Sequence, residues 1–476
     1  MAAAGRSISI TTPLGSDVLV LTGFSGREAI SQLFDFHLDL VAANGAQVPF
    51  EALLGRPATV SLTLPTGGKR FFSGIISRFG QGSRGLTFTS YRAELVPSFW
   101  LSTRRQTSRI FQQLSVPDIL QQLLADIPVE FRLEGAFEPR NYCVQYRETD
   151  FEFASRLMEE EGIFYFFEHG SDGHQLVVAN SPRGNTDVPG PSSIVFDPTG
   201  ARRSSSAAVF QWEANQELRS GLYALRDYNF ELPDSSLEEH ASIQDSVQVG
   251  AVPHRLKLPV NEGLEIYDYP GGYAKRFDGI DPGGGEQPDE LQKIFADGQR
   301  TVAIRMQEEA VPSIDVSGAA TAPQLTPGYA FTLQQQFNGN GRYVLTSVDH
   351  SAQVSPTGDV TYTNQFRCIP DTLPFRPARR TARPAIQGTQ TAVVVGPAGE
   401  EIYTDKYGRI KVQFHWDREG KKDEHSSCWV RVAIPPGAPF EPPHIDWEVV
   451  VAFEEGDPDQ PIVVGTVFNP RRPPPP

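Results

Sequence analysis

The stretch Glu401–Gly420, EIYTDKYGRIKVQFHWDREG, places His415, Trp416 and Asp417 in succession after a run of charged residues. From residue 409 to 416, polar and hydrophobic residues alternate, which is the period of a β-strand. One face carries Ile410, Val412, Phe414 and Trp416, and the other carries Arg409, Lys411, Gln413 and His415. The stretch is therefore predicted to be one strand after a tight turn, with Trp416 buried and His415 on the polar face.

A catalytic role for this stretch is the alternative. His415 and Asp417 share the polar face, and that geometry permits an ion pair, but a catalytic dyad also needs a nucleophile and a cleft. Cys428 and His425 are close in sequence, yet they flank the start of a strand in a charged turn. We predict no catalytic, cofactor-binding or metal-binding residue here or elsewhere in the chain.

Further short strand patterns surround this stretch: TAVVVG, SSCWVRVAI, EVVVAF and PIVVGTVF, all within fewer than 100 residues. Turns such as YG, REGKKD and EEGDPDQP separate them. That spacing is typical of a small antiparallel barrel, predicted over residues 388–469, with a proline-rich end at 470–476.

Residues 371–387 are rich in proline and arginine and lack hydrophobic periodicity, which marks a domain boundary. An extended, solvated linker is the favoured interpretation. In the alternative interpretation, the arginines of this segment bind an acidic partner surface.

Residues 1–370 mostly show strand patterns, interrupted by helical intervals. Gly80, Gly82 and Gly85 satisfy G-x-G-x-x-G, but the following residues have period 2 rather than the helical period that a dinucleotide site requires, so a glycine-rich hairpin loop is predicted.

Helices are predicted at SVPDILQQLLAD, ETDFEFASRLMEEEG and ELQKIFADGQRTVAIRMQEEA, with a cap at Ser115 and at Thr149 or Asp150. His169 and His174 are predicted to be exposed turn residues, and residues 278–290 a mobile acidic loop that lacks calcium-site spacing.

The composition narrows the classes of function. The chain has 476 residues and a formal net charge of -16, which opposes binding to nucleic acid. Cys143, Cys368 and Cys428 are too few and too scattered for a disulfide framework or a zinc site, and are expected to be buried, reduced thiols. No signal peptide and no membrane-spanning stretch is recognised.

Two long blocks of the terminal segment, EIYTDKYGRIKVQFHWDREGKKDEHSSCWVRVA and VVVAFEEGDPDQPIVVGTVFN, resemble the VgrG family, the trimeric spike proteins of the bacterial type VI secretion system. YRETDFEFASRLMEEEGIFYFFEH, LEIYDYPGGY and PGYAFTL resemble further blocks in family order, so that the likeness covers nearly the whole chain.

The resemblance implies a mainly β fold with helical insertions (α+β). Residues 1–370 would form a phage-tail-hub-like base of two barrel-like subdomains, and residues 388–469 an OB-fold barrel. The resemblance also implies a homotrimer that sits on an Hcp tube ring and contacts baseplate components. This trimer would carry effector or adaptor proteins and touch membranes transiently on injection. Such a protein would assemble in the bacterial cytoplasm and leave without a signal peptide.

The sequence departs from the family in two places. IPPGAPFEPPHIDW (residues 434–447) replaces a usual glycine-rich stretch, which predicts an altered loop. The family usually continues into a triple-stranded β-helix, whereas NPRRPPPP follows the last strand here, and proline cannot donate to a ladder. Docking of a PAAR-repeat protein at a needle tip is therefore in doubt.

Three classes of function compete. The first is a structural spike that catalyses nothing. The second is a spike-associated, muramidase-like hydrolase, which would need about 100 further residues. The third is an OB module that binds carbohydrate or nucleic acid, which would need exposed aromatic residues among basic ones. The lack of a convergent catalytic set favours the spike.

Overall fold

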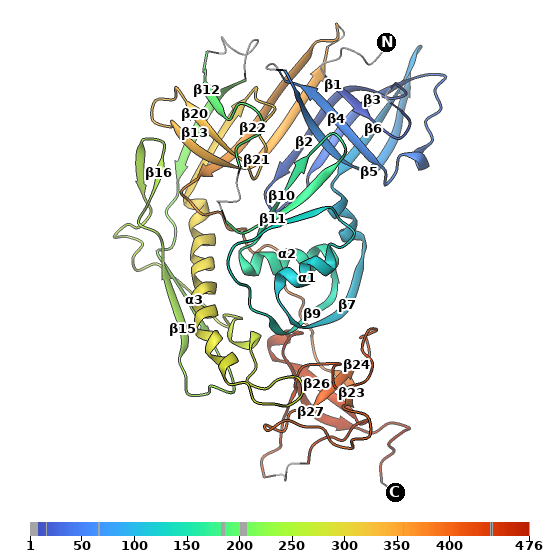
Figure 1. The fold of residues 1–476 in the computed structure, drawn as a ribbon, viewed down its shortest axis with the longest axis vertical. Helices are drawn as coiled ribbons and strands as arrows, with labels where there is room; N and C mark the ends of the chain where they lie inside the picture. The colour runs from blue at the N-terminus through green and yellow to red at the C-terminus, as the bar shows by residue number, and fades with distance from the viewer. Residues whose placement is uncertain are drawn as a thin grey trace.

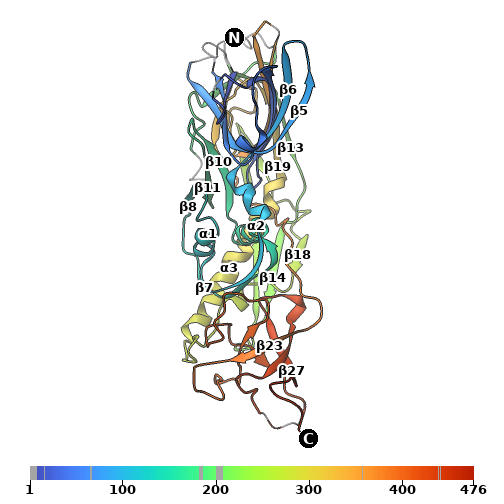
Figure 2. The same cartoon turned by 90° about the vertical axis from the view of Figure 1, so that its right-hand side faces the viewer.

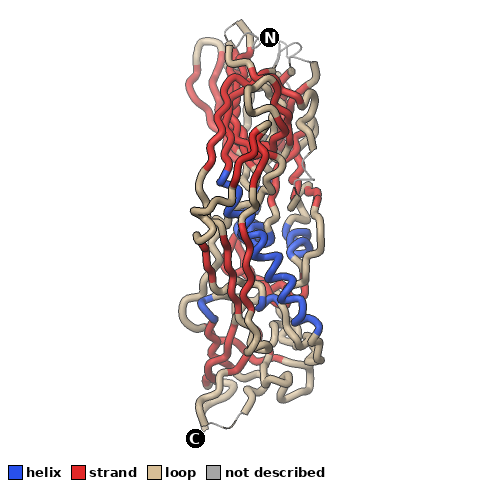
Figure 3. Tube along the Cα trace, turned by 90° about the vertical axis from the view of Figure 1, so that its left-hand side faces the viewer, coloured by secondary structure: helices blue, strands red, loops and turns tan. Residues whose placement is uncertain are grey.

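A computed structural model describes residues 8–475 except 16, 65–66, 182–185, 200–206, 356, 438 and 440. The molecule is elongated, and the N-terminal strands and the C-terminal segment lie at opposite ends (Figure 1). Figure 3 shows the helices gathered between the strand-rich ends. We use base for residues up to 370, connecting segment for 371–387 and terminal barrel for 388–469, the boundaries proposed from the sequence.

The base is built on one sheet of twelve strands that forms two barrel-like halves. In spatial order, the first half contains β1 (Ile8–Thr11), β4 (Pro57–Thr63), β5 (Lys69–Arg84), β6 (Phe88–Val96), β3 (Asp35–Ala43) and β2 (Val20–Ala29). The second half contains β21 (Gly341–Val354), β20 (Ala330–Gln334), β12 (Ser193–Phe196), β13 (Ala208–Gln216), β19 (Ile314–Ala320) and β22 (Val360–Pro370). An antiparallel pairing of β2 with β21 joins the halves, and β21 also pairs with β22, which closes the second half on itself.

Alternation along the strands explains which face each one buries. In β3, Phe36, Leu38, Leu40 and Ala42 are buried while the residues between them are exposed or half-buried. The predicted glycine-rich hairpin is confirmed, because β5 and β6 pair antiparallel with no helix between them. However, Gly80 and Gly82 lie within the long strand β5, and only Gly85 adjoins the turn.

Two short helices begin at the caps that the sequence predicts. α1 (Val116–Leu123) starts after Ser115, and α2 (Asp150–Glu161) starts after Thr149, and both have a reciprocal capping box. Gly162 ends α2 with a φ of 67°, a left-handed conformation that glycine adopts without a steric penalty.

Replacing Thr149 by alanine should lower the stability of the base by about 1 kcal/mol, because the variant loses the hydroxyl that accepts the Glu152 backbone N–H at 3.1 Å. Thermal unfolding followed by circular dichroism measures the loss. Thr149→Ser keeps the hydroxyl and should stay close to the wild type, and equal losses in both variants would contradict a capping role.

The middle of the molecule combines helices with small sheets. The long helix α3 (Asp289–Ala310) packs on β15 (Leu237–Ser242) and β14 (Leu222–Asp227), which form a sheet with β18 (Glu265–Asp268). The remaining strands of the base form a three-stranded sheet and two ribbons: β10 (Phe164–His169), β11 (His174–Ala179) and β8 (Val129–Arg132); β16 (Ser246–Val249) and β17 (Val252–Arg255); β7 (Gln106–Leu114) and β9 (Arg140–Thr149).

The terminal barrel is a five-stranded sheet in the order β24 (Lys411–Phe414), β23 (Gln390–Val395), β26 (Glu448–Phe453), β27 (Pro461–Val467) and β25 (Arg431–Val432). Ile410, Val412 and Phe414 are buried, as the alternation predicts. Trp416 is only half-buried and stacks on Phe414. The opposite face is not a solvated rim: Arg409, Lys411 and Gln413 are buried, and only His415 is exposed.

Candidate functional site: the junction between base and terminal barrel

The ribbon β7–β9 is the apolar part of the junction. Tyr142 and Val144 of β9 are buried in the same hydrophobic cluster as the terminal-barrel core, whereas Cys143 between them belongs to the core of the base. Each face of β9 therefore packs against a different part of the molecule. The Val144 backbone N–H also donates to the Asp459 carboxylate at 2.6 Å, so that apolar and polar contacts fix the same strand.

Arg409 forms a first ionic anchor across the junction. Its guanidinium donates twice to Asp278 of the base, at 2.8 Å each, and once to Asp405 of its own turn at 2.6 Å. All three side chains are buried. Bidentate pairing of this kind fixes orientation as well as distance. Asp405 also accepts the backbone N–H groups of Tyr407 and Arg409, which holds the turn that presents the arginine.

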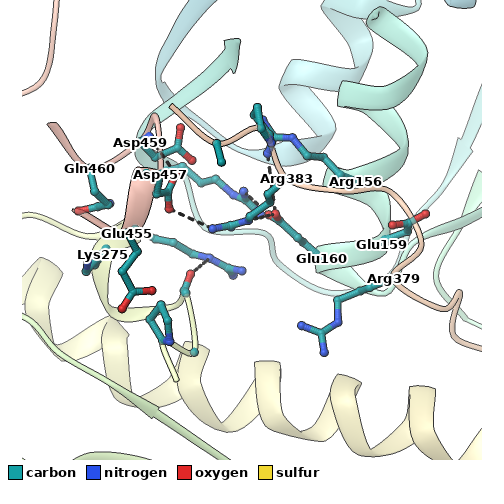
Figure 4. Close-up of a pocket in the computed structure, with 18 of the residues that line it drawn as sticks. Arg156, Glu159, Glu160, Lys275, Arg379, Arg383, Glu455, Asp457, Asp459 and Gln460 are labelled. Atoms are coloured by element: carbon teal, nitrogen blue, oxygen red, sulfur yellow. Dashed lines mark hydrogen bonds and ion pairs between the residues drawn. The ribbon is translucent and has the colours of Figure 1, made fainter. Parts of the chain in front are cut away.

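The second anchor surrounds Glu160 at the end of α2. Its carboxylate pairs with Arg140 of β9 at 2.7 Å and with Arg383 of the connecting segment at 2.9 Å. Arg383 continues to Asp457 of the terminal barrel at 3.1 Å, so one chain of ion pairs links three parts of the molecule (Figure 4). Glu161 pairs with Arg140 and Arg276 in the same way.

The connecting segment is extended and about half of it is exposed, as the favoured interpretation predicts, but contacts with the rest of the chain hold it in place. Arg376 donates to the carbonyls of Gly162 and Asn180, and Arg379 pairs with Glu308 of α3 at 3.3 Å. The alternative interpretation also holds in part, except that the acidic surface belongs to the chain itself.

A cavity of about 560 Å³ lies among these groups. Figure 4 shows the labelled side chains converging on it from α2, the connecting segment and the loop after β26. Its lining includes seven basic and seven acidic side chains: Arg140, Arg156, Lys275, Arg276, Arg305, Arg379, Arg383, Glu159, Glu160, Glu308, Glu454, Glu455, Asp457 and Asp459. Because the two signs balance, the lining attracts neither polyanions nor polycations strongly.

Burial opposes ionisation of two carboxyl groups in this junction, but the neighbouring charges outweigh burial at only one of them. Burial opposes ionisation of Glu160, but Arg383, Arg140 and Arg156 outweigh it and hold the pKa of this carboxyl well below its usual range. At Asp459, burial and the neighbouring charge of Asp457 prevail over the arginines and raise the pKa.

The opposite shifts predict a pH dependence. Glu160 contributes stability above its unfolded pKa, and that contribution is lost as the pH falls through the acid range. Asp459 contributes stability at low pH, which is lost as the pH rises through its raised folded pKa. Asp459→Asn should therefore flatten the loss of stability between about pH 4 and pH 7, the interval between the ordinary and the raised pKa of this carboxyl, and leave the acid limb unchanged. Thermal midpoints across pH measure both limbs, and an unchanged profile in that interval would contradict this role of Asp459.

The candidate catalytic residues of the terminal barrel do not come together. His415 contacts Thr391 at 3.0 Å, and the Asp417 carboxylate accepts from Gln413 and from turn backbone groups. His425 is exposed, and burial raises the pKa of the Cys428 thiol to about 12, which removes its nucleophilic form at neutral pH. As predicted, Cys143, Cys368 and Cys428 are buried and unpaired.

The prediction that His169 and His174 are exposed is wrong. The two residues pair across the β10–β11 hairpin, but this hairpin packs against the first barrel half. The His169 ring is buried and lies 3.2 Å from Glu28, which also contacts Arg70 at 2.8 Å and His350 at 2.9 Å. A turn signal in the sequence does not show what the turn packs against.

The acidic loop 278–290 is tied to the terminal barrel rather than free. Asp278 holds Arg409, and the Trp429 indole donates to the Asp281 carbonyl at 2.8 Å. Within the described part of the chain, no cluster of three or more His, Cys, Asp or Glu residues has the geometry of a metal site. Among the same residues, no helix combines the length and hydrophobicity needed to cross a membrane.

Two family models divide the chain where the fold does. The family described as "Phage tail baseplate hub (GPD)" matches residues 27–356, and "Type VI secretion system/phage-baseplate injector OB domain" matches residues 391–468. The E. coli c3393 protein, described as a type VI secretion component similar to the T4 tail proteins gp27 and gp5, has the same fold. It superimposes with a TM-score of 0.63 at 21% identity, over 94% of this chain and 97% of that one.

These matches define a phage-baseplate-like hub joined to an injector OB domain. Among curated relatives, the spike protein VgrG1a of Pseudomonas aeruginosa is 38% identical, over 98% of this chain and 70% of its own length. VgrG1c of the same organism is 36% identical, over 98% of this chain and 62% of its own length. The chain belongs to the VgrG family of type VI secretion system spike proteins.

The chain spans 62% of VgrG1c and 60% of VgrG1b, a third Pseudomonas aeruginosa relative. The altered loop predicted at residues 434–447 includes positions 438 and 440, which lie outside the described residues. The described part of that loop places Asp446 at a φ of 70° and stacks Trp447 on His444.

Proposed function

We propose that the chain is a structural subunit of a type VI secretion spike. Three copies would form the hub, seat it on an Hcp tube ring within the baseplate, and transmit axial force to the terminal barrels. The observation that carries this proposal is the junction. There the buried Arg409–Asp278 pair, the partly exposed Arg383–Glu160 pair and the shared strand β9 attach the terminal barrel to the base.

Such a junction suits a load-bearing part. Arg409–Asp278 and Arg383–Glu160 connect segments more than 100 residues apart, so they oppose separation of the two parts rather than local unfolding. The relatives are named as spike proteins, and a neutral, ion-paired cavity is unlike an enzyme cleft. We therefore propose a non-enzymatic role.

The outward face of the terminal barrel supports trimer formation. Val449 and Val451 are buried inside, whereas Val450 and Ala452 face outward and are only half-covered. Register places Ala452 beside Ile462 of β27, which is also half-covered, so an apolar strip crosses two strands. In a homotrimer, such a strip would pack against its neighbours.

The remaining partners follow the same proposal. A solved complex of VgrG with PdpA shows that one member of this structural class binds a second protein, and effector or adaptor cargo is proposed here. Assembly in the bacterial cytoplasm would precede injection, with transient membrane contact. Docking of a PAAR-repeat protein is not part of the proposal.

Light scattering coupled to size exclusion tests the trimer. At micromolar concentration the mass should be about three times the 52.5 kDa of one chain. Val450→Asp should shift the protein toward monomers, because the carboxylate would be buried unpaired in the seam.

The matched control is Leu86→Asp, a fully exposed residue at the tip of the β5–β6 hairpin, which should leave the mass unchanged. A wild-type protein that stays a folded monomer would contradict the proposal, and so would a trimer that Val450→Asp leaves intact.

A further inference from the structure

The strand β18 presents an open edge on the side of the base. It pairs in parallel with β14 on one side, and among the described residues no strand pairs with its other side. Figure 2 shows β18 at the border of the molecule in that view. An open edge offers a row of backbone donors and acceptors to another strand. β18 is short and carries no lysine, proline or bulge, and its charged side chains, Glu265 and Asp268, repel an acidic strand but not a basic one.

The side chains around this edge are aromatic, aliphatic and acidic. Tyr267 and Tyr269 are 53% and 49% exposed, and Leu264 next to the strand is also exposed. Residues 258–274 contain Glu262, Glu265 and Asp268 and no lysine, arginine or histidine. Among the described residues, His240 lies 3.9 Å from Glu265 and Arg379 lies 4.0 Å from Asp268, and both contacts are long.

We propose that the open edge of β18 binds an extended, basic segment of another protein, which adds to the sheet as a fourth strand. Backbone hydrogen bonds along β18 supply the pairing. Glu265 and Tyr267 are two residues apart in β18 and therefore lie on the same face of the sheet. A lysine or arginine on that face of the incoming strand meets a carboxylate and an aromatic ring.

A second copy of the chain fits this edge less well. The opposite edge strand, β15, carries Glu238, Glu239 and His240, and β18 carries Glu265 and Asp268. Pairing either edge of this sheet with β18 of another copy would place carboxylates opposite carboxylates, which is destabilising. A basic partner avoids that repulsion, and the net charge of -16 favours its approach.

Fluorescence anisotropy with a labelled twelve-residue peptide, in which arginine alternates with threonine and valine, tests the proposal on the full chain. The peptide should bind, and Glu265→Lys/Asp268→Lys should weaken binding about tenfold or more through charge repulsion. The control Glu134→Lys/Asp172→Lys reverses two exposed acids elsewhere and should leave binding within about twofold. Thermal unfolding confirms that both variants fold.

Removing backbone N–H donors from the peptide distinguishes strand addition from simple charge attraction. The same peptide with N-methylated backbone amides at alternate positions keeps every side chain but cannot complete the ladder, so its binding should be lost. Equal binding by the methylated peptide would overturn the proposal, and so would no binding of the parent peptide at 1 mM. A change of oligomeric mass in Glu265→Lys/Asp268→Lys would overturn it too, because the edge would then be a seam between copies. None of these readouts requires the proposed trimer to exist.

Discussion

Replacing Arg409 by methionine should cost about 3–5 kcal/mol of the free energy that holds the terminal barrel on the base. Methionine fills a similar volume but leaves Asp278 and Asp405 buried without their cation. An uncompensated buried carboxylate is far more costly than the loss of one exposed ion pair.

Two measurements report this loss in the full chain. Tryptophan fluorescence follows Trp429, whose indole bonds to the base beside this anchor, and limited proteolysis follows exposure of the connecting segment. Arg431→Met is the matched control, because Arg431 lies at the same junction but is 44% exposed and pairs with Glu454 at 3.6 Å. Its cost should stay below about 1 kcal/mol.

A second replacement identifies the source of the cost. Adding Asp278→Asn to the Arg409→Met variant should recover part of the stability, because it removes one of the orphaned charges. If Arg409→Met and Arg431→Met cost the same, or if Asp278→Asn gives no recovery, the Arg409 cluster does not anchor the junction.

Replacing Glu28 by glutamine should destabilise the base itself by about 3–5 kcal/mol. The Glu28 carboxylate contacts Arg70, His169 and His350, and all four side chains are buried. Burial opposes its ionisation, but Arg70 and the hydrogen bonds from the histidines hold the pKa of Glu28 below its usual range. Glutamine keeps the shape and leaves the Arg70 charge unpaired.

Circular dichroism of thermal and urea unfolding measures this effect. Glu94→Gln is the control on the same sheet, because its partner Arg78 is mostly exposed, and its cost should stay below about 1 kcal/mol. Arg70→Met in the Glu28→Gln background should restore part of the stability. A loss in Glu28→Gln no larger than in Glu94→Gln would show that the buried cluster is not a stabilising centre.

The strands and helices follow from local patterns. Period-2 alternation predicts the buried face of β24, and Ser115 and Thr149 mark the helix starts because a side-chain oxygen caps the free N–H groups of the first turn. These features depend on neighbours within about four residues, which the sequence displays directly.

The candidate site depends on contacts between distant segments, and the sequence misses most of it. Arg409 and Asp278 are 131 residues apart, and no spacing rule joins them. His169 has the sequence surroundings of an exposed turn, yet the first barrel half covers it. The arginines of the connecting segment carry the composition of a solvated linker, yet they meet acids on α2 and α3.

The sequence alone therefore determined the strands of the terminal barrel, the starts of α1 and α2 and the family, because alternation, caps and long similar blocks are local properties. The tertiary structure alone decided that the polar face of β24 is buried, that the connecting segment is bound, and that ion pairs around Arg409 and Glu160 hold the junction. The physical reason is that a charge is stable inside the protein only beside an opposite charge, and the fold determines which segments bring those charges together.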